Sequence, residues 1–200
     1  MIFFVYFTRR TASAKNNFRF VLFMAASTLI TMIVGKGFEQ MLGNSLTTPA
    51  TIGVSLIVTG LFLILIEHGI QAGAKSQAEI NWKDSIFIGV AQALAIIPGI
   101  SRSGSTLIAA LWCGLSKDLA LRYSFLLSIP IILGLSLLKL TDFMNSLDLR
   151  YIKELWLAFA AAFLSALIGI KWMIDMVKRA KLSYFAVYCI AVGIVTWLYF

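Results

Sequence analysis

Long apolar runs separated by short polar stretches constrain the fold of this 200-residue chain more than any other feature. Five of them are long enough to cross about 30 Å of hydrocarbon as helices that rise about 1.5 Å per residue. They cover residues 18–35, 50–68, 122–140, 156–177 and 183–200. Hydrophobic residues make up 60% of the chain, whereas soluble domains usually contain about 45–50%. We therefore predict an all-α integral membrane protein with a single domain over residues 1–200.

A polar segment interrupts the apolar stretches 86–97 and 107–115. It reads Pro98-Gly99-Ile100-Ser101-Arg102-Ser103-Gly104-Ser105-Thr106. An arginine stays charged at membrane depth, and its planar fork suits phosphate oxygens, although a structural ion pair is the alternative role. The glycines let the backbone approach a ligand, and a helix that follows would point its free N–H groups at an anion. The segment therefore predicts a phosphate site inside a membrane protein.

The apolar stretches on either side of this segment are too short to cross a membrane alone. Residues 85–97 would form a helix of about 20 Å, and residues 105–115 a shorter one. Together they predict a re-entrant hairpin at about residues 85–115, which enters and leaves the membrane on one side, with Asp84 capping its first helix. The alternative is one long span that is kinked at Pro98.

The distribution of basic residues favours the hairpin. With a hairpin, eleven lysines and arginines lie on one side of the membrane and four on the other, so the positive-inside rule assigns the first side to the cytoplasm. The eleven are Arg9, Arg10, Lys15, Arg19, Lys75, Lys83, Lys117, Arg122, Lys178, Arg179 and Lys181, and the four are Lys36, Lys139, Arg150 and Lys153. A full crossing would erase this bias. The net charge of +8 thus reflects membrane topology, and we expect no nucleic-acid partner.

Other residues carry weaker signals. His68, the only histidine, ends a predicted span beside Glu67, where both a catalytic base and a polar interface residue fit the sequence. Cys113 and Cys189 lie in apolar segments and predict packed thiols, since no metal-ligand spacing accompanies them. Residues 1–7 are apolar but too few to span, and they resemble the end of a membrane helix.

Residues 90–106, V-A-Q-A-L-A-I-I-P-G-I-S-R-S-G-S-T, resemble the second signature of the undecaprenyl-diphosphatases, the bacitracin-resistance membrane phosphatases of bacteria. Residues 123–130, Y-S-F-L-L-S-I-P, are similar to the segment that follows it in that family. The resemblance implies a helical bundle of two inverted repeats, each a re-entrant hairpin followed by three spans. Residues 1–68 would be the remainder of the first repeat and residues 85–200 the second. The family's first signature, of the form E-G-x-T-E-F-L-P-x-S-S-T-G-H, does not occur here, so the first repeat is predicted to be truncated.

The resemblance implies hydrolysis of undecaprenyl diphosphate to the monophosphate at the outer side of the bacterial cytoplasmic (inner) membrane. This reaction recycles the lipid carrier of peptidoglycan synthesis and protects against bacitracin. Arg102, Ser101 and Thr106 are the predicted catalytic residues. Arg102 would hold the diphosphate and offset charge on the transferred phosphoryl group, and the two hydroxyls would donate hydrogen bonds to it. Ser101 could instead act as a nucleophile, which requires a base that the sequence does not show.

Ser103, Gly99 and Gly104 are predicted to contribute to phosphate binding. For Ser101 and Ser103 a helix cap is the alternative role, and for the glycines it is loop geometry alone. The family resemblance also implies a divalent cation, Mg²⁺ or Ca²⁺, whose ligands are not in this chain.

Two other functions fit the same sequence. Inverted repeats and broken helices suit a polyprenyl-phosphate transporter or flippase. The absent Glu-rich signature suits an inactive N-terminally truncated remnant, or half of a split protein. In each case the expected partners are a polyprenyl lipid and the membrane, and a homodimer is a further expectation.

Overall fold

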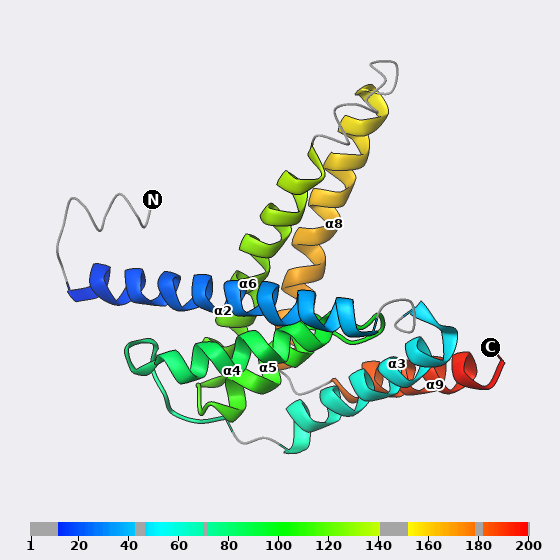
Figure 1. Cartoon of the computed structure of the whole chain (residues 1–200), viewed down its shortest axis with the longest axis horizontal. Coiled ribbons are helices and arrows are strands. Elements are labelled where there is room, and N and C mark those ends of the chain that lie inside the picture. Colours follow the sequence, from blue (N-terminus) through cyan, green and yellow to red (C-terminus); the bar gives the residue numbers. More distant parts are fainter. Residues whose placement is uncertain (1–11, 43–46, 70–71, 141–151, 179–181, 200) are drawn as a thin grey trace. The chain divides into compact units, whose positions relative to one another are not determined.

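A computed structural model describes residues 12–42, 47–69, 72–140, 152–178 and 182–199 of the chain. Helices α2 to α9 account for most of these residues, and in this part of the chain β structure is limited to an isolated bridge between Lys75 and Leu115 (Figure 1). The α-helices are α2 (Ala12–Leu42), α3 (Pro49–Ile64), α4 (Trp82–Ala93), α5 (Arg102–Trp112), α6 (Lys117–Leu138), α8 (Ile152–Lys178) and α9 (Ser183–Tyr199). Shorter turns of helix cover Leu65–Gly69, Gln77–Glu79 and Leu94–Ile96. The predicted membrane-helix end at residues 1–7 lies outside the described residues.

Four helices of the described residues are long and apolar enough to cross a membrane. They are Asn16–Met41, Pro49–His68, Lys117–Leu137 and Lys153–Asp175. The predicted all-α integral membrane class is therefore confirmed. The fifth predicted span corresponds to α9, an apolar helix of 17 residues that is shorter than the other four.

The first predicted span is too short at its C-terminal end. The sequence predicts an end at Gly35, whereas α2 continues through Lys36 to Leu42. Glycine inside a helix costs only about 1 kcal/mol, so Gly35 does not end it. Instead Gly35 gives room to the Ile96 side chain, because a Cβ added at Gly35 would overlap Ile96 Cδ1.

The chain divides into two compact units, which we consider separately. The first unit comprises Met1–Pro130 and Leu182–Phe200, and the second comprises Ile131–Lys181. Helix α6 begins in the first unit and continues past Pro130 into the second, which also contains α8. Every residue of the polar segment 98–106 lies in the first unit. The assignment of residues 1–68 and 85–200 to two inverted repeats stays a prediction.

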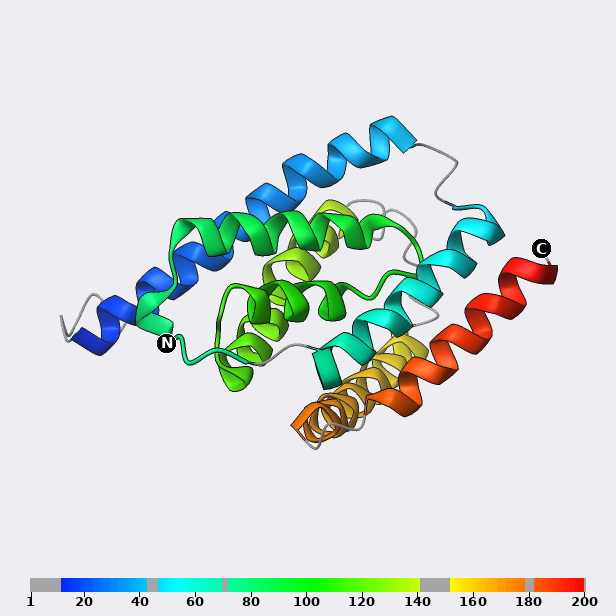
Figure 2. The same ribbon diagram turned by 90° about the horizontal axis from the view of Figure 1, so that it is seen from below.

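Helices α4 and α5 form the predicted hairpin. They contact each other and are joined by a turn at residues 97–101 (Figure 2). With 12 and 11 residues they are about 18 and 16 Å long, roughly half the hydrocarbon thickness. A single kinked span is excluded, because α5 returns to the beginning of α4. The predicted cap is corrected in detail. Asn81 is the N-cap of α4, and Asp84 completes a capping box by accepting the Asn81 N–H at 2.9 Å.

The core of the first unit lies between α2, the hairpin and the beginning of α6. Tyr123 of α6 is fully buried, packs edge-on against Phe20 of α2, and bonds Ser27 Oγ through its hydroxyl at 2.8 Å. Thr31 donates to the Gly89 carbonyl of α4 at 2.9 Å. These hydroxyls tie α2 to α4 and α6 and so place the hairpin.

Helices α3 and α9 pack through small residues. A Cβ added at Gly53 would lie 2.8 Å from the Gly193 carbonyl oxygen, and one added at Gly60 would lie 2.8 Å from the Ala186 carbonyl oxygen. The missing side chains at these glycines let the two helix backbones come into direct contact, as small residues allow in membrane proteins. These close contacts hold α3 in place, so that elements packed on its other face have a fixed neighbour.

Candidate functional site

The N-terminus of α5 lies at the tip of the hairpin and carries unpaired N–H groups. Ser101 is its N-cap, and the Ser101 Oγ accepts the Gly104 N–H at 3.1 Å. The Ser105 N–H bonds the Ser101 carbonyl at 2.9 Å. Among the described residues, the N–H groups of Arg102 and Ser103 have no acceptor. A helix N-terminus with unpaired donors is a favourable place for an anion.

Arg102 is the first residue of α5 and is half-buried. In the part of the chain that the structure describes, its guanidinium forms no hydrogen bond and no ion pair. The structural ion pair that would be its alternative role is therefore not formed there. A half-buried arginine on the first turn of a helix whose first N–H groups are unpaired adds positive charge to the N-terminal end of α5, as the predicted phosphate site requires.

The turn before α5 rests on α3 through Gly99 and Thr59. Gly99 has a φ of +96°, and a Cβ there would lie 2.8 Å from Ser55 Cβ and 2.9 Å from the Ile52 carbonyl oxygen. Thr59 donates to the Gly99 carbonyl at 2.7 Å and accepts the Ser101 N–H at 2.9 Å. The structure thus gives Gly99 a role in close packing, and it adds Thr59, which the sequence analysis missed because it lies 40 residues earlier in the chain.

Hydroxyl groups attach the first turns of α5 to α6. Thr106 is 2% exposed, and its Oγ1 lies 3.0 Å from the Arg102 carbonyl and 2.5 Å from Ser124 Oγ. Ser124 donates to the Ser103 carbonyl at 3.1 Å. The Ser103 hydroxyl lies 3.4 Å from the Ser101 hydroxyl. Thr106 and Ser124 therefore hold α5 against α6, while the hydroxyls of Ser101 and Ser103 lie at the N-terminal end of α5.

Gly104 has a steric role at the same cap. A Cβ at this position would lie 3.1 Å from Ser101 Oγ and 3.2 Å from Ser101 Cβ. These distances are tighter than most real Cβ contacts, so a larger residue would press on the hydroxyl that caps α5. Glycine here keeps the Ser101 hydroxyl within reach of the Gly104 N–H.

Gln92, on α4, is an unusual buried polar residue. It is 2% exposed, and its Nε2 has no hydrogen-bond partner in the described residues. Leaving a buried donor unpaired costs about 1–3 kcal/mol. An apolar residue of the same size at this position would avoid that cost.

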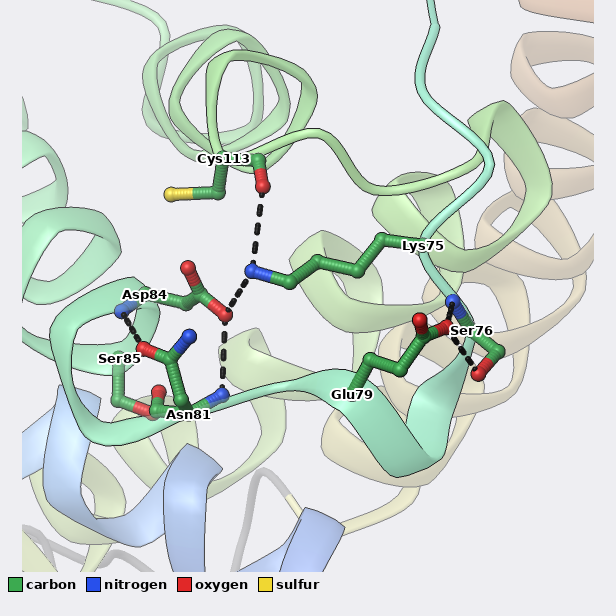
Figure 3. A network of polar contacts seen from close by, with 7 residues as sticks. All are labelled: Lys75, Ser76, Glu79, Asn81, Asp84, Ser85 and Cys113. Carbon is green, nitrogen blue, oxygen red and sulfur yellow. Dashed lines mark hydrogen bonds and ion pairs between the residues drawn. The ribbon is translucent and has the colours of Figure 1, made fainter.

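At the open end of the hairpin, where α4 begins and α5 ends, Lys75 contacts both helices (Figure 3). The Lys75 ammonium group bonds Asp84 Oδ2 at the start of α4 at 2.6 Å and the Cys113 carbonyl at the end of α5 at 3.3 Å. The Lys75 backbone N–H donates to the Gly114 carbonyl at 3.1 Å, and its carbonyl accepts the Ser116 N–H at 3.3 Å. One residue therefore binds both ends of the hairpin. No motif indicated this contact, because Lys75 lies outside the polar segment.

Two groups beside this contact have shifted pKa values. Hydrogen bonds from the Ser76 hydroxyl and backbone N–H lower the pKa of the Glu79 carboxyl (Figure 3). Burial, together with the nearby Asp84 carboxylate, raises the pKa of the Cys113 thiol to about 11. Cys113 is therefore a protonated, packed thiol at neutral pH, in agreement with its sequence interpretation.

His68 belongs to a different cluster, which caps α9. Its Nε2 lies 3.1 Å from Glu67 Oε1 and 3.3 Å from Ser183 Oγ, and Glu67 Oε2 accepts the Ser183 N–H at 2.6 Å. The same ring nitrogen faces both the carboxylate and the hydroxyl, whereas a catalytic triad uses one ring nitrogen for each. Because Glu67 binds the first turn of α9, the cluster has a structural role at the end of a span.

The described residues of the site do not fit the implied divalent cation. Around the tip of the hairpin they supply hydroxyl and carbonyl oxygens and one guanidinium, whereas Mg²⁺ and Ca²⁺ sites are usually built on carboxylates. No group of three His, Cys, Asp or Glu side chains that could hold a metal ion occurs in this part of the chain. We assign no step to a metal ion.

Comparison with known proteins identifies relatives over nearly the whole chain. The family model described as bacitracin resistance protein BacA matches residues 2–195. Undecaprenyl-diphosphatase 1 of Shouchella clausii is 42% identical over 199 residues, which are 98% of this chain and 72% of that protein. Undecaprenyl-diphosphatase 2 of Halalkalibacterium halodurans is 42% identical over 200 residues, covering 99% and 72%. The undecaprenyl-diphosphatase of Oceanobacillus iheyensis is 34% identical over 197 residues, covering 96% and 70%.

Proposed function

Because this chain belongs to the BacA family of bacitracin resistance proteins, we propose that it hydrolyses undecaprenyl diphosphate to undecaprenyl monophosphate and inorganic phosphate. One water is consumed and one phosphoanhydride bond is broken. The protein is a multi-pass membrane enzyme that acts on a lipid. Its reaction returns the lipid carrier to peptidoglycan synthesis and protects the cell from bacitracin.

The observation that carries the proposal is the tip of the hairpin. There, the Arg102 guanidinium and the backbone N–H groups of Arg102 and Ser103 have no partner among the described residues. We assign these donors to the diphosphate. Negative charge on the transferred phosphoryl oxygens is stabilised by preorganised donors, and this effect usually makes the largest contribution to such catalysis.

The hydroxyl groups of the segment take different roles in this proposal. Ser101 caps α5, and its Oγ contacts the Gly104 N–H and the Ser103 hydroxyl, neither of which is a base. We therefore assign Ser101 and Ser103 to phosphate binding rather than to nucleophilic attack, which needs an adjacent base. Thr106 orients α5 through Ser124, and Gly99 and Gly104 shape the turn.

Two further features of the proposal concern placement in the membrane. We propose that the site opens toward the outer side of the cytoplasmic membrane, while the open end of the hairpin near Lys75 lies on the cytoplasmic side. The charge bias of the sequence supports this orientation. A homodimer stays a prediction. The transporter alternative is not favoured, because the relatives are named as phosphatases.

The direct test replaces Arg102 in the protein reconstituted into lipid vesicles with undecaprenyl diphosphate. We expect Arg102→Ala to lower the rate of phosphate release by at least about 100-fold, a typical effect of losing a donor to the transition state. Arg102→Lys keeps the charge but loses the bidentate fork, and we expect a loss of about tenfold or more.

The matched control is Arg19→Ala. Arg19 is exposed on α2 and stacks on the Phe23 ring 5.6 Å away, outside the hairpin. This variant should release phosphate at nearly the wild-type rate. A folded Arg102→Ala variant with wild-type turnover would overturn the proposed site, and an inactive wild-type protein would overturn the proposed reaction.

A further inference from the structure

Thr59 of α3 contacts the tip of the hairpin through both functions of its hydroxyl. It donates to the Gly99 carbonyl at 2.7 Å and accepts the Ser101 N–H at 2.9 Å. The residue is 4% exposed, so water does not compete for these bonds. A threonine hydroxyl has one hydrogen to donate, and Thr59 donates it to the turn rather than to a carbonyl of its own helix, α3.

The two bonded groups lie on either side of Ile100. The Gly99 carbonyl belongs to the peptide group before Ile100, and the Ser101 N–H belongs to the peptide group after it. The two hydrogen bonds therefore fix the two peptide planes around Ile100. Ser101 is the N-cap of α5, and Arg102 follows it directly. The Thr59 hydroxyl thus sets the position at which the unpaired donors of α5 begin.

Helix α3 is a suitable reference for this positioning because it is itself closely held. Gly99 packs against Ser55 and Ile52 of α3, and Gly53 and Gly60 on α3 contact the backbone of α9. The turn therefore rests on a pair of helices packed backbone to backbone. Movement of the turn relative to α3 would break both hydrogen bonds of Thr59.

We propose that Thr59 is a positioning residue of the phosphatase reaction, which holds the turn 97–101 so that Arg102 and the first N–H groups of α5 meet the transferred phosphoryl group. The inference rests on the function proposed above. Thr59 does not touch the substrate in this account. It acts through Ser101 and Gly99.

The test compares Thr59→Val, which replaces the hydroxyl by a methyl group of similar size, with Thr59→Ser, which keeps the hydroxyl. Both variants are reconstituted in lipid vesicles with undecaprenyl diphosphate, and kcat and KM are measured separately. Misplaced catalytic groups cost up to about 100-fold in rate, so we expect Thr59→Val to lower kcat by about tenfold or more. KM should change much less, because the loosened turn must be reordered for the chemical step. Thr59→Ser should restore most of kcat.

The matched control is Thr28→Val. Thr28 is a buried threonine of α2 whose hydroxyl, within the described ranges, bonds the Met24 carbonyl of its own helix, at 2.9 Å, and no other group. This variant undergoes the same chemical change without touching the turn, and its kcat should equal that of the wild type. Thermal unfolding of all variants is measured in the same detergent.

Each outcome of these measurements either supports or overturns the positioning role of Thr59. A stable Thr59→Val variant with wild-type kcat would overturn the positioning role while leaving the phosphatase function intact. Equal losses in Thr28→Val and Thr59→Val would do the same. If Thr59→Val does not accumulate in the membrane, Thr59→Ala replaces it. Failure of both would assign Thr59 to folding and overturn the inference. An inactive wild-type protein would instead count against the proposed function.

Discussion

The hydroxyl groups of residues 101–106 all bond within the protein, whereas the Arg102 guanidinium has no partner among the residues described. This contrast separates two kinds of polar residue in one short segment. The hydroxyls build the end of α5, where those of Ser101 and Ser103 are also proposed to bind phosphate, and the guanidinium remains available to a ligand. A charge without a partner at membrane depth is costly, which is the physical reason to assign it to substrate binding.

The cap of α5 can be tested at Ser101. Ser101→Ala removes the acceptor for the Gly104 N–H, and we expect it to lower the free energy of unfolding by about 1 kcal/mol. Ser101→Asn supplies another good N-cap and should unfold near the wild-type temperature. Thermal unfolding in detergent measures both. If the asparagine variant is as unstable as the alanine variant, the cap does not explain the loss.

At Gln92 we expect a substitution to raise the free energy of unfolding rather than lower it. Gln92→Met replaces an unpaired buried amide by an apolar side chain of similar shape, so we expect the free energy of unfolding to rise by about 1 kcal/mol. Gln77→Met is the control, because the Gln77 amide is paired with Asn17 Oδ1 at 3.0 Å. It should gain nothing. A loss of stability in Gln92→Met would show that the amide has a partner in the folded protein.

At the scale of elements, the hairpin is held at both ends by residues from outside it. Thr59 of α3 holds the tip, and Lys75 holds the open end. The hairpin helices are too short to be fixed by the membrane alone, so these contacts and the packing of α2 and α6 determine where Arg102 lies.

The open end can be loosened by Lys75→Met. The change leaves Asp84, whose side chain is 8% exposed, without its cation, and Lys75 itself is only 23% exposed. Breaking a buried pair costs about 3–5 kcal/mol, and we expect the lower end of that range here. Lys83→Met, at an exposed lysine that directly precedes Asp84 in the chain, is the control. Equal unfolding temperatures of the two variants would contradict the role of Lys75.

The packing of α3 on α9 is tested by Gly193→Val. A Cβ at Gly193 would lie 2.6 Å from the Gly53 carbonyl oxygen, so the helices must separate, at a cost of about 1–3 kcal/mol. Gly37→Val is the control, because a Cβ there meets no atom within 4 Å. We expect a lower unfolding temperature for Gly193→Val alone. Because α3 supports the turn, phosphate release should fall as well.

Sequence patterns predicted the elements better than the contacts between them. Apolar length and the polar interruption at 98–106 were sufficient to predict the four long spans and the hairpin, whereas Arg102, expected in the loop between two short helices, is the first residue of α5. The extension of α2 past Gly35, the cap at Asn81, and the contacts of Thr59 and Lys75 were missed. The missed extension and contacts depend on packing between separate elements, such as Gly35 against Ile96 or Thr59 against the turn, for which periodicity carries no signal.

At the scale of the whole molecule, we expect the two ends of the hairpin to lie on one side of the membrane. Lys83→Cys and Lys117→Cys, in a background with Cys113 and Cys189 replaced by alanine, should both react with a membrane-impermeant maleimide from the cytoplasmic side. Lys36→Cys should react from the outer side. Labelling of positions 83 and 117 from opposite sides would show that the chain crosses the membrane between them.

Protection of the turn by substrate is the most direct measurement of whether the tip of the hairpin binds the diphosphate from the outer side. Ile100→Cys, in the same cysteine-free background, is labelled from the outer side with a membrane-impermeant maleimide in the presence of undecaprenyl diphosphate or of undecaprenol, which has no phosphate. We expect labelling from that side, and protection by the diphosphate alone. Labelling only from the cytoplasmic side, or equal protection by both lipids, would contradict this expectation.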